Sequence, residues 1–461
     1  MGRRRRGARR VALVLAAALA TCGLLAVAGS CFVAGFELVD ESDAAATGGG
    51  NAGGAAGAGA GGAGAGDAAV CQHAVWPEPP QDAGAGPDDV DFVVAVRRIF
   101  LGEDPADAGP LPDGGMSPDE IGYDLDRMCT CQGEGDSCLV PQYAEANHCD
   151  GPAGRDQASV KLFQVAAIFS PEIDSEFQSQ RVQEGFWSLL LRVRHYNGTA
   201  NDGQVDLAVY TTPGFRDDPC NPDFPKWDGT DRWPIDESSV KLKGGPDGGA
   251  GGSGGAGGAG GSGDAGGAGG SGGGGGACPG KGSLDQLYDI NDPVYVDHYA
   301  YVADWRLVAS VPESKFIIVG SETYLSIKLA AAFISARIEK QQQPDQPPTY
   351  ALREGLVTGR WRAEDIFGTL ETLGTTGHAL CTDDKFYSIF KDFVCGHIDI
   401  RSQLGKPTDP CDAISFVMGA EADPALLGSV RETPEPAASS CEEGTNPAKD
   451  SCSNFLPEKD E

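Results

Sequence analysis

An alternation of apolar and polar residues with a period of two restricts the fold of this chain more than any other feature. In residues 187–194, Trp187, Leu189, Leu191 and Val193 fall on one face, and most residues between them are polar. The pattern returns in residues 205–209 after a loop rich in Asn and Gly. Such alternation is typical of half-buried strands, and a turn-forming loop between two of them predicts an antiparallel hairpin.

Other segments extend this β pattern. Further strands are predicted at residues 91–101, 294–302, 305–311, 316–319, 324–329, 333–338 and 350–358, and helices at 159–169, 364–373 and 383–394. Strands separated by Pro and Gly favour two packed antiparallel sheets. We therefore predict a mainly β fold, a disulfide-stapled β-sandwich with a few peripheral helices, flanked and interrupted by Gly-rich disordered tracts.

Two low-complexity tracts divide the sequence. Residues 48–66 are almost entirely Gly and Ala, and residues 244–276 contain 22 Gly in 33 positions. We expect the second tract to be an insertion inside one β domain, because residues 71–243 offer too few strands for a sandwich of about seven. The predicted parts are a signal peptide (1–30), a lipidated N-terminus with a Gly/Ala tether (31–70), the two parts of the β domain (71–243 and 277–430) with the insertion (244–276) between them, and an acidic, Cys-containing tail (431–461).

The first 40 residues predict export. Residues 2–10 are basic and residues 11–36 carry no charge, which is the pattern of a secretory leader. The segment 28–31, Ala-Gly-Ser-Cys, resembles a bacterial lipobox, so Cys31 is the predicted lipidation site. Ordinary signal cleavage and an uncleaved anchor are the alternatives. The expected location is the cell envelope, anchored at the outer membrane through the lipid, or otherwise the secreted fraction.

The charge of the chain restricts its partners. The net charge is −32, and the six arginines of residues 3–10 are the only charged side chains before Glu37, so the remainder carries −38. A chain this acidic repels phosphate backbones, and we expect no nucleic-acid partner. Attraction to cations, or simple solubility, explains the charge better.

The cysteines fit an oxidising compartment. Of fourteen, Cys22 and Cys31 belong to the leader region, and the remaining twelve would allow six disulfides. The spacing of the cysteines at 129, 131, 138 and 149, with His148 adjacent, also suits zinc. We favour disulfides there because export places the segment outside the reducing cytosol.

Two pairings near the C-terminus are open to prediction. We predict a disulfide between Cys381 and Cys395, although the helix expected between them opposes it, and Cys411 is the rival partner of Cys395. Beyond residue 433 the chain is rich in Pro and acidic residues, and we expect Cys441 and Cys452 to staple this tail.

One loop has the composition of a ligand site. Carboxylates could bind Ca²⁺ through oxygen, and indole rings could stack on a sugar. The alternative is a Pro-rich surface loop that holds two tryptophans in the edge of a core. The candidate metal ligands are Asp217, Asp218, Asp228 and Asp231, and the candidate carbohydrate ligands are Trp227 and Trp233.

No catalytic constellation can be nominated. Acidic residues are too numerous to single out a pair, and the six histidines form no metal-binding motif. No organic cofactor is expected. The first hypothesis is therefore a non-catalytic binding or structural protein that recognises polysaccharide, and the alternative is a hydrolase that cleaves a polymer with two carboxylates.

Four segments resemble a known group of proteins. They are residues 121–126, the hairpin of 189–210, residues 355–361 and residues 410–413, and they are similar to uncharacterised envelope lipoproteins common in myxobacteria. The resemblance spans much of residues 90–430. It implies an envelope address and brings no known activity.

Overall fold

The computed structural model describes the part of the chain that follows the first Gly-rich tract. The described residues are 71–82, 84, 86, 89–102, 120–169, 173–215, 224–244, 283–319, 324–342, 347–370, 380–432 and 441–454. Cys31, the 1–70 segment and both Gly-rich tracts lie outside them, apart from Gly244.

Strands dominate this part of the chain. They are β1 (Val90–Phe100), β2 (Ser188–Tyr196), β3 (Asp202–Thr212), β4 (Arg232–Asp236), β5 (Val240–Leu242), β6 (Tyr288–Pro293), β7 (Tyr295–Ala303), β8 (Arg306–Val319), β9 (Tyr324–Gln341), β10 (Thr349–Arg362) and β11 (Ala413–Arg431). The α-helices are α3 (Ala158–Phe169), α4 (Ser175–Gln183), α5 (Ala363–Leu370) and α6 (Lys385–Gly396), with short 3-10 helices at Pro152–Gly154, Glu237–Ser239, Pro447–Lys449 and Cys452–Asn454.

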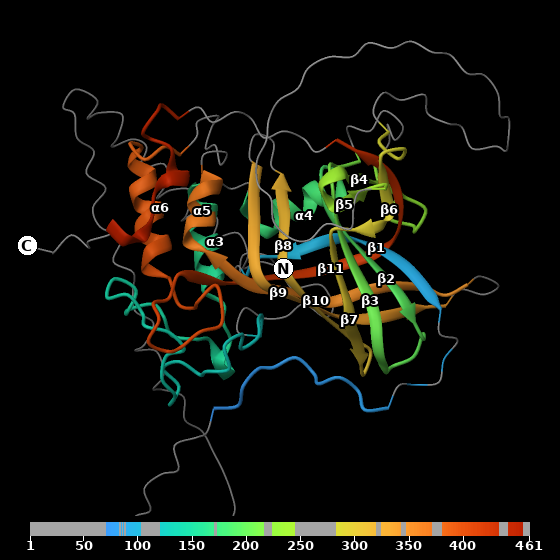
Figure 1. The fold of residues 1–461 in the computed structure, drawn as a ribbon, viewed down its shortest axis with the longest axis horizontal. Helices are drawn as coiled ribbons and strands as arrows, with labels where there is room; N and C mark the ends of the chain where they lie inside the picture. The colour runs from blue at the N-terminus through green and yellow to red at the C-terminus, as the bar shows by residue number, and fades with distance from the viewer. Residues whose placement is uncertain are drawn as a thin grey trace, which may run out of the picture. The chain divides into compact units, whose positions relative to one another are not determined.

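Eight of these strands close into a barrel. They are hydrogen-bonded in the order β1-β2-β3-β7-β8-β9-β10-β11, and β1 pairs with β11 to complete the circle (Figure 1). The expectation of a mainly β, disulfide-bonded fold is confirmed, but the predicted sandwich is wrong. One sheet closes on itself because the long strand β11 pairs with β10 on one side and β1 on the other.

Strands from both sides of residues 245–282 share this sheet. β3, which precedes that segment, pairs antiparallel with β7, which follows it. β4 joins the sheet at its margin by pairing in parallel with β11. A separate two-stranded sheet, β5 with β6, also joins the two halves of the sequence.

Apolar side chains pack against both faces of β2. Leu189, Leu191 and Val193 belong to the main core inside the barrel, as the alternation predicts. Leu190, which breaks the alternation, is also fully buried, in a second core on the other surface with Trp233 and residues of β3 and β4. A continuous apolar run is the expected sequence of a strand covered on both faces.

The helices confirm part of the sequence prediction. Helices were predicted at 159–169, 364–373 and 383–394, and α3, α5 and α6 occupy these positions with small shifts at their ends. Asp384 caps α6 by accepting a hydrogen bond from the backbone N–H of Phe386. The sequence pattern did not predict α4, whose apolar residues are few.

Five disulfides hold the described chain together. They join Cys71 with Cys129, Cys131 with Cys149, Cys138 with Cys411, Cys381 with Cys441, and Cys395 with Cys452. The disulfide interpretation of the cysteines at 129–149 is therefore confirmed, as is the stapled tail. Cys220 and Cys278 lie outside the described residues.

Both predicted partners of Cys395 are wrong. Cys381 precedes α6 and Cys395 lies in the last turn of this helix, whose rise keeps the two residues too far apart for a bond. The tail supplies a partner for each, and Cys411 bonds to Cys138 from a distant part of the chain.

None of the helices in the described ranges is long and apolar enough to span a membrane.

Candidate functional site

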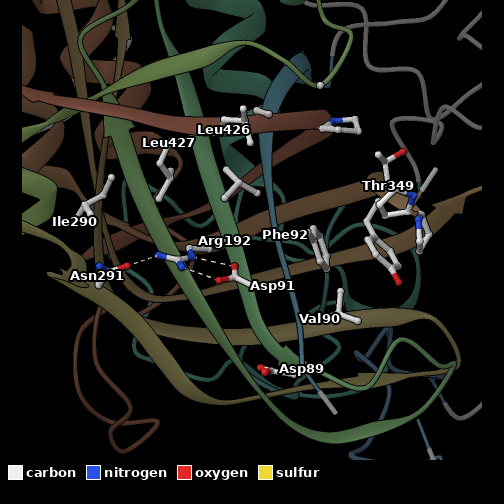
Figure 2. A pocket seen from close by; sticks show the side chains of 17 residues that line it. Asp89, Val90, Asp91, Phe92, Arg192, Ile290, Asn291, Thr349, Leu426 and Leu427 are labelled. Carbon is white, nitrogen blue, oxygen red and sulfur yellow. Dashed lines mark hydrogen bonds and ion pairs between the residues drawn. The ribbon is translucent and has the colours of Figure 1, made fainter. Parts of the chain in front are cut away.

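A cavity of about 720 Å³ opens beside the start of β1. We call it the seam cavity. It is lined by Asp89, Val90, Asp91, Phe92, Val93, Arg192, Gly229, Ile290, Asn291, Pro347, Pro348, Thr349, Tyr350, Pro424, Ala425, Leu426 and Leu427 (Figure 2).

The cavity exists because β11 leaves the barrel wall. β11 pairs with β10 as far as Ala422 and with β1 as far as Ala425. From Leu426 onward its partner is β4. Pro424, which cannot donate a backbone hydrogen bond, lies at this departure. The first residues of β1 and β10 therefore lack β11 as a neighbour, and the cavity opens where they approach each other.

The polar wall of the seam cavity is a fixed network. Arg192 of β2 donates Nε to Asp91 Oδ1 at 3.0 Å and Nη2 to Asp91 Oδ2 at 2.6 Å. Its Nη1 donates to Asn291 Oδ1 at 2.9 Å, and Figure 2 shows the guanidinium between these two partners. The hydrogen bond to Asp91 raises the pKa of Arg192 above its usual value. The Asp91 side chain remains 44% exposed, so part of its carboxylate faces solvent.

The remaining wall is apolar and partly aromatic. Phe92 stacks on Tyr350 with ring centroids 4.8 Å apart, which closes the floor between β1 and β10. Ile290 of β6 and Leu426 and Leu427 of β11 project from the other sides (Figure 2). A largely apolar concavity with a few oriented polar groups is the usual form of a small-ligand site.

The loop predicted to bind a ligand lies beside this cavity, but most of its side chains serve the loop itself. Asp228 accepts hydrogen bonds from the N–H and hydroxyl of Thr230, which lower the pKa of Asp228. Asp231 is buried and accepts from the backbone N–H groups of Lys226 and Trp227. These contacts form a turn and do not converge on a shared ligand position.

The two tryptophans of the loop are placed in a core edge. Trp233 is fully buried against Phe215 and Trp227, so neither face of its ring is available to a sugar. Trp227 donates its indole N–H to the carbonyl of Gln183. This arrangement matches the alternative interpretation of the loop. Among the described residues of the loop, Gly229 alone lines the seam cavity, and Asp217 and Asp218 lie outside the described part of the chain.

A second polar region lies in the Cys-rich segment between β1 and α3. Carboxylate oxygens of Asp124, Asp126 and Asp156 lie within 4.8 Å of one another, and oxygen donors at this spacing could hold a divalent cation. Each of them also has a partner in the protein. The N–H of Leu125 donates to Asp156 at 2.6 Å, that of Met128 donates to Asp126 at 2.9 Å, and Asp124 contacts His73. These contacts explain the carboxylate positions without a ligand.

Burial and mutual repulsion change the acidity of this region. Burial raises the pKa of Asp150 to about 8 and that of Asp399 to about 7. It also raises the pKa of Asp156 well above the usual range. Arg360 lies nearby and donates Nη2 to the carbonyl of Leu125 at 2.8 Å. Asp150, Asp156 and Asp399 therefore keep their protons to a higher pH than ordinary carboxyl groups, because burial penalises the charged form.

The cysteines beside this region are not metal ligands. Cys131 and Cys149 lie close to His148, and Cys129 lies close to His73, but all three sulfurs are committed to disulfides. The zinc interpretation of the cysteine spacing is therefore wrong.

Sequence reasoning did not find the residues of the seam cavity. Asp91 and Arg192 are about a hundred positions apart, and only the register of β1 against β2 brings them together. The hairpin pattern places Arg192 on the outward face of its strand, but no local signal identifies its partner. No protein-family model matches this chain, and comparison with curated proteins and with solved structures also finds no match.

Proposed function

We propose that this chain is a non-catalytic, envelope-anchored binding protein that accepts a saccharide unit in the seam cavity. The observation that carries the proposal is the combination of size and lining. A volume of about 720 Å³ falls within the range of about 300–1,000 Å³ found for small-ligand sites. The Arg192 network supplies oriented polar groups on one wall, and Phe92 and the leucines supply an apolar surface on the others.

This lining suits a sugar ring. Sugars present hydroxyl groups around the ring edge and C–H groups on its faces. The carboxylate of Asp91 and the amide of Asn291 can exchange hydrogen bonds with hydroxyl groups. The apolar wall can cover a ring face, which removes apolar area from water.

The geometry favours binding over cleavage. Both oxygens of Asp91 already accept hydrogen bonds from Arg192, so this carboxyl group is held as an acceptor. A glycoside hydrolase needs a second, protonated carboxyl group as a general acid. Asp89 is the other acidic residue in the lining, and it is exposed to solvent, so no buried carboxyl group among the described lining residues faces Asp91 across the cavity.

The proposed location rests on sequence and is consistent with the disulfides. Five disulfides in the described residues fit an oxidising compartment outside the cytoplasm. The leader and Cys31 then suggest a lipid anchor, as does the resemblance to myxobacterial envelope lipoproteins.

The direct test is calorimetric titration of the whole mature protein with tetrasaccharides. The panel contains four tetramers, one each of a hexose, an N-acetylhexosamine, a hexosamine and a uronic acid. At least one should bind, and Arg192→Gln should weaken it by about tenfold or more, as expected when a charge-assisted hydrogen-bond network is lost.

Arg194→Gln is the matched control. Arg194 lies two residues further along the outward face of β2 and forms its own ion pair with Asp206, at 3.1 Å, but does not line the cavity. The Arg194→Gln variant should bind the tetramer with the same affinity as the unaltered protein. Failure of every tetramer to bind, or an equal loss in both variants, would contradict the proposal. Release of new reducing ends that Asp89→Asn abolishes would instead identify the alternative, a hydrolase.

A further inference from the structure

We infer that the seam cavity selects a cationic amino sugar over neutral and acidic sugars. This inference rests on the saccharide-binding function proposed above and names the class of sugar. It follows from the charge of the lining residues, from the orientation that Arg192 imposes on Asp91, and from the chemistry of the remaining wall.

The lining carries an excess of negative charge. Among the seventeen lining residues, Arg192 is the only basic one, and Asp89 and Asp91 are both acidic. The charge of Arg192 is matched by Asp91 through two hydrogen bonds. Asp89 is exposed and forms no ion pair with any described residue. One uncompensated carboxylate therefore faces the cavity, and a protonated amine would neutralise it.

Arg192 also determines which oxygen positions remain for a ligand. Its Nε and Nη2 groups approach the two oxygens of Asp91 from one side, and Nη1 is held by Asn291. The carboxylate is therefore fixed, and its solvent-facing lone pairs point away from the guanidinium. A ligand donor meets an oriented acceptor, which reduces the entropy lost on binding.

The same charges disfavour acidic sugars. A uronic acid would place its carboxylate near Asp89 and Asp91, and the one guanidinium in the lining is already occupied. The net charge of −32 on the whole chain adds a long-range attraction for cations and repulsion for anions. The apolar surface of Phe92, Leu426 and Leu427 remains available for the ring face, whichever substituent the sugar carries.

The experiment compares two probes that differ only in acetylation. They are the glucosamine tetramer, and its fully N-acetylated counterpart. Both are titrated into the whole mature protein at a pH of about 6, where amines are protonated. We expect the glucosamine tetramer to bind about tenfold more tightly, in keeping with one charge-assisted hydrogen bond. The difference should shrink when ionic strength rises from about 0.05 M to about 0.5 M.

Two variants distinguish the cavity from general attraction to an acidic surface. Asp89→Asn should remove most of the preference for the charged tetramer, because the carboxylate that faces the amine is lost. Asp383 is exposed just before α6 and does not line the cavity. Asp383→Asn should therefore leave both affinities unchanged.

The outcomes separate the inference from the function on which it rests. If the acetylated tetramer binds as tightly as the charged one, or if Asp383→Asn weakens the charged tetramer as much as Asp89→Asn, the inference is overturned and saccharide binding stands. If neither probe nor any other tetramer binds, both are overturned.

Discussion

Arg192 and Asp91 tie the second strand of the barrel to the first through two hydrogen bonds of 3.0 and 2.6 Å. The pair lies on the outward face of the barrel, with side-chain exposures of 16% for Arg192 and 44% for Asp91. Partly exposed pairs contribute little to stability because water already solvates their charges. The pair is therefore better placed to orient a ligand than to hold the barrel closed.

If the pair mainly orients a ligand, removing either partner should change the free energy of unfolding only slightly. Arg192→Gln and Asp91→Asn should each lower the free energy of unfolding by about 1 kcal/mol or less, and a double-mutant cycle should give a coupling of about 0.5–1 kcal/mol. Chemical denaturation under oxidising conditions measures both quantities. A coupling above about 3 kcal/mol would show that the pair is structural, and losses of sugar binding in these variants would then have to be attributed to misfolding.

The strand pattern could be predicted from the sequence to a useful extent. The hairpin of β2 and β3 and the positions of β1, β7 and β10 follow from alternation, because each buries one face in the barrel. The predicted segments 305–311 and 316–319 are parts of the single strand β8, and 324–329 and 333–338 are parts of β9. Interruptions of the pattern, such as Pro312 in β8, divide each long strand into two apparent segments in the sequence.

The closure of the barrel could not be predicted, and neither could its cavity. β11 contains Pro424 and several small residues, which do not mark a strand, yet it pairs with three partners. Alternation along β2, with Leu191 and Val193 facing inward, would place His195 on the inward face as well. The left-handed backbone of this residue turns it outward, with 64% of its side chain exposed, and places Tyr196 in the core instead. Such changes in register depend on distant neighbours.

The buried carboxylates predict that stability falls as pH rises. Burial raises the folded-state pKa of Asp150 to about 8 and of Asp399 to about 7, above the ordinary value of 3.8. A carboxyl whose folded pKa is raised favours folding in its neutral form. This contribution is complete below the unfolded pKa and is lost as pH rises through the folded one. The thermal midpoint should therefore be higher at about pH 5 than at about pH 9.

Asp150→Asn isolates this contribution. The amide oxygen can still accept the hydrogen bond that Asp150 receives from the N–H of Thr130, but the side chain can no longer ionise. The variant should lose less stability than the unaltered protein between the two pH values. Asp383→Asn controls for the general acidity of the chain. An unchanged pH profile in Asp150→Asn would contradict the assignment.

Loss of the disulfide from Cys138 to Cys411 should destabilise the fold more than loss of the disulfide from Cys131 to Cys149. The first bond closes a sequence separation of 273 residues, whereas the second closes 18. Longer loops lose more entropy on cross-linking, so paired alanine substitution at the first bond should cost about 2 kcal/mol more than at the second. Denaturant unfolding of both variants measures the difference. Equal losses would mean that native-state strain or residual structure outweighs loop length.

The lipid anchor is testable by mass spectrometry of the native protein. If Cys31 is the lipidation site, the mature N-terminus should be Cys31 carrying two or three acyl chains. Cys31→Ser should move the protein from the membrane fraction to the soluble one. An unmodified N-terminus at Phe32 or later would contradict the prediction.

The segment between β5 and β6 should be dispensable for folding. β5 and β6 pair directly, with Leu242 opposite Tyr288, and the N–H of Lys243 donates to the carbonyl of Leu287 at 2.7 Å. Lys243 and Leu287 are therefore neighbours on the two sides of residues 245–282, and a short turn could connect β5 with β6. Closing a flexible loop of 33 residues costs about 3 kcal/mol, which a shorter connection would partly recover.

The two halves of the sequence, in contrast, should not fold apart. Residues 71–243 supply β1 to β5 and residues 283–432 supply β6 to β11, so separation exposes the edges of β3, β7, β1 and β11. We expect each half alone to aggregate or to unfold without cooperativity, because neither can close the barrel. A chain with residues 244–276 shortened to a few residues should retain the full unfolding midpoint. Independent, cooperative and monomeric folding of both halves would show instead that the tract links two domains.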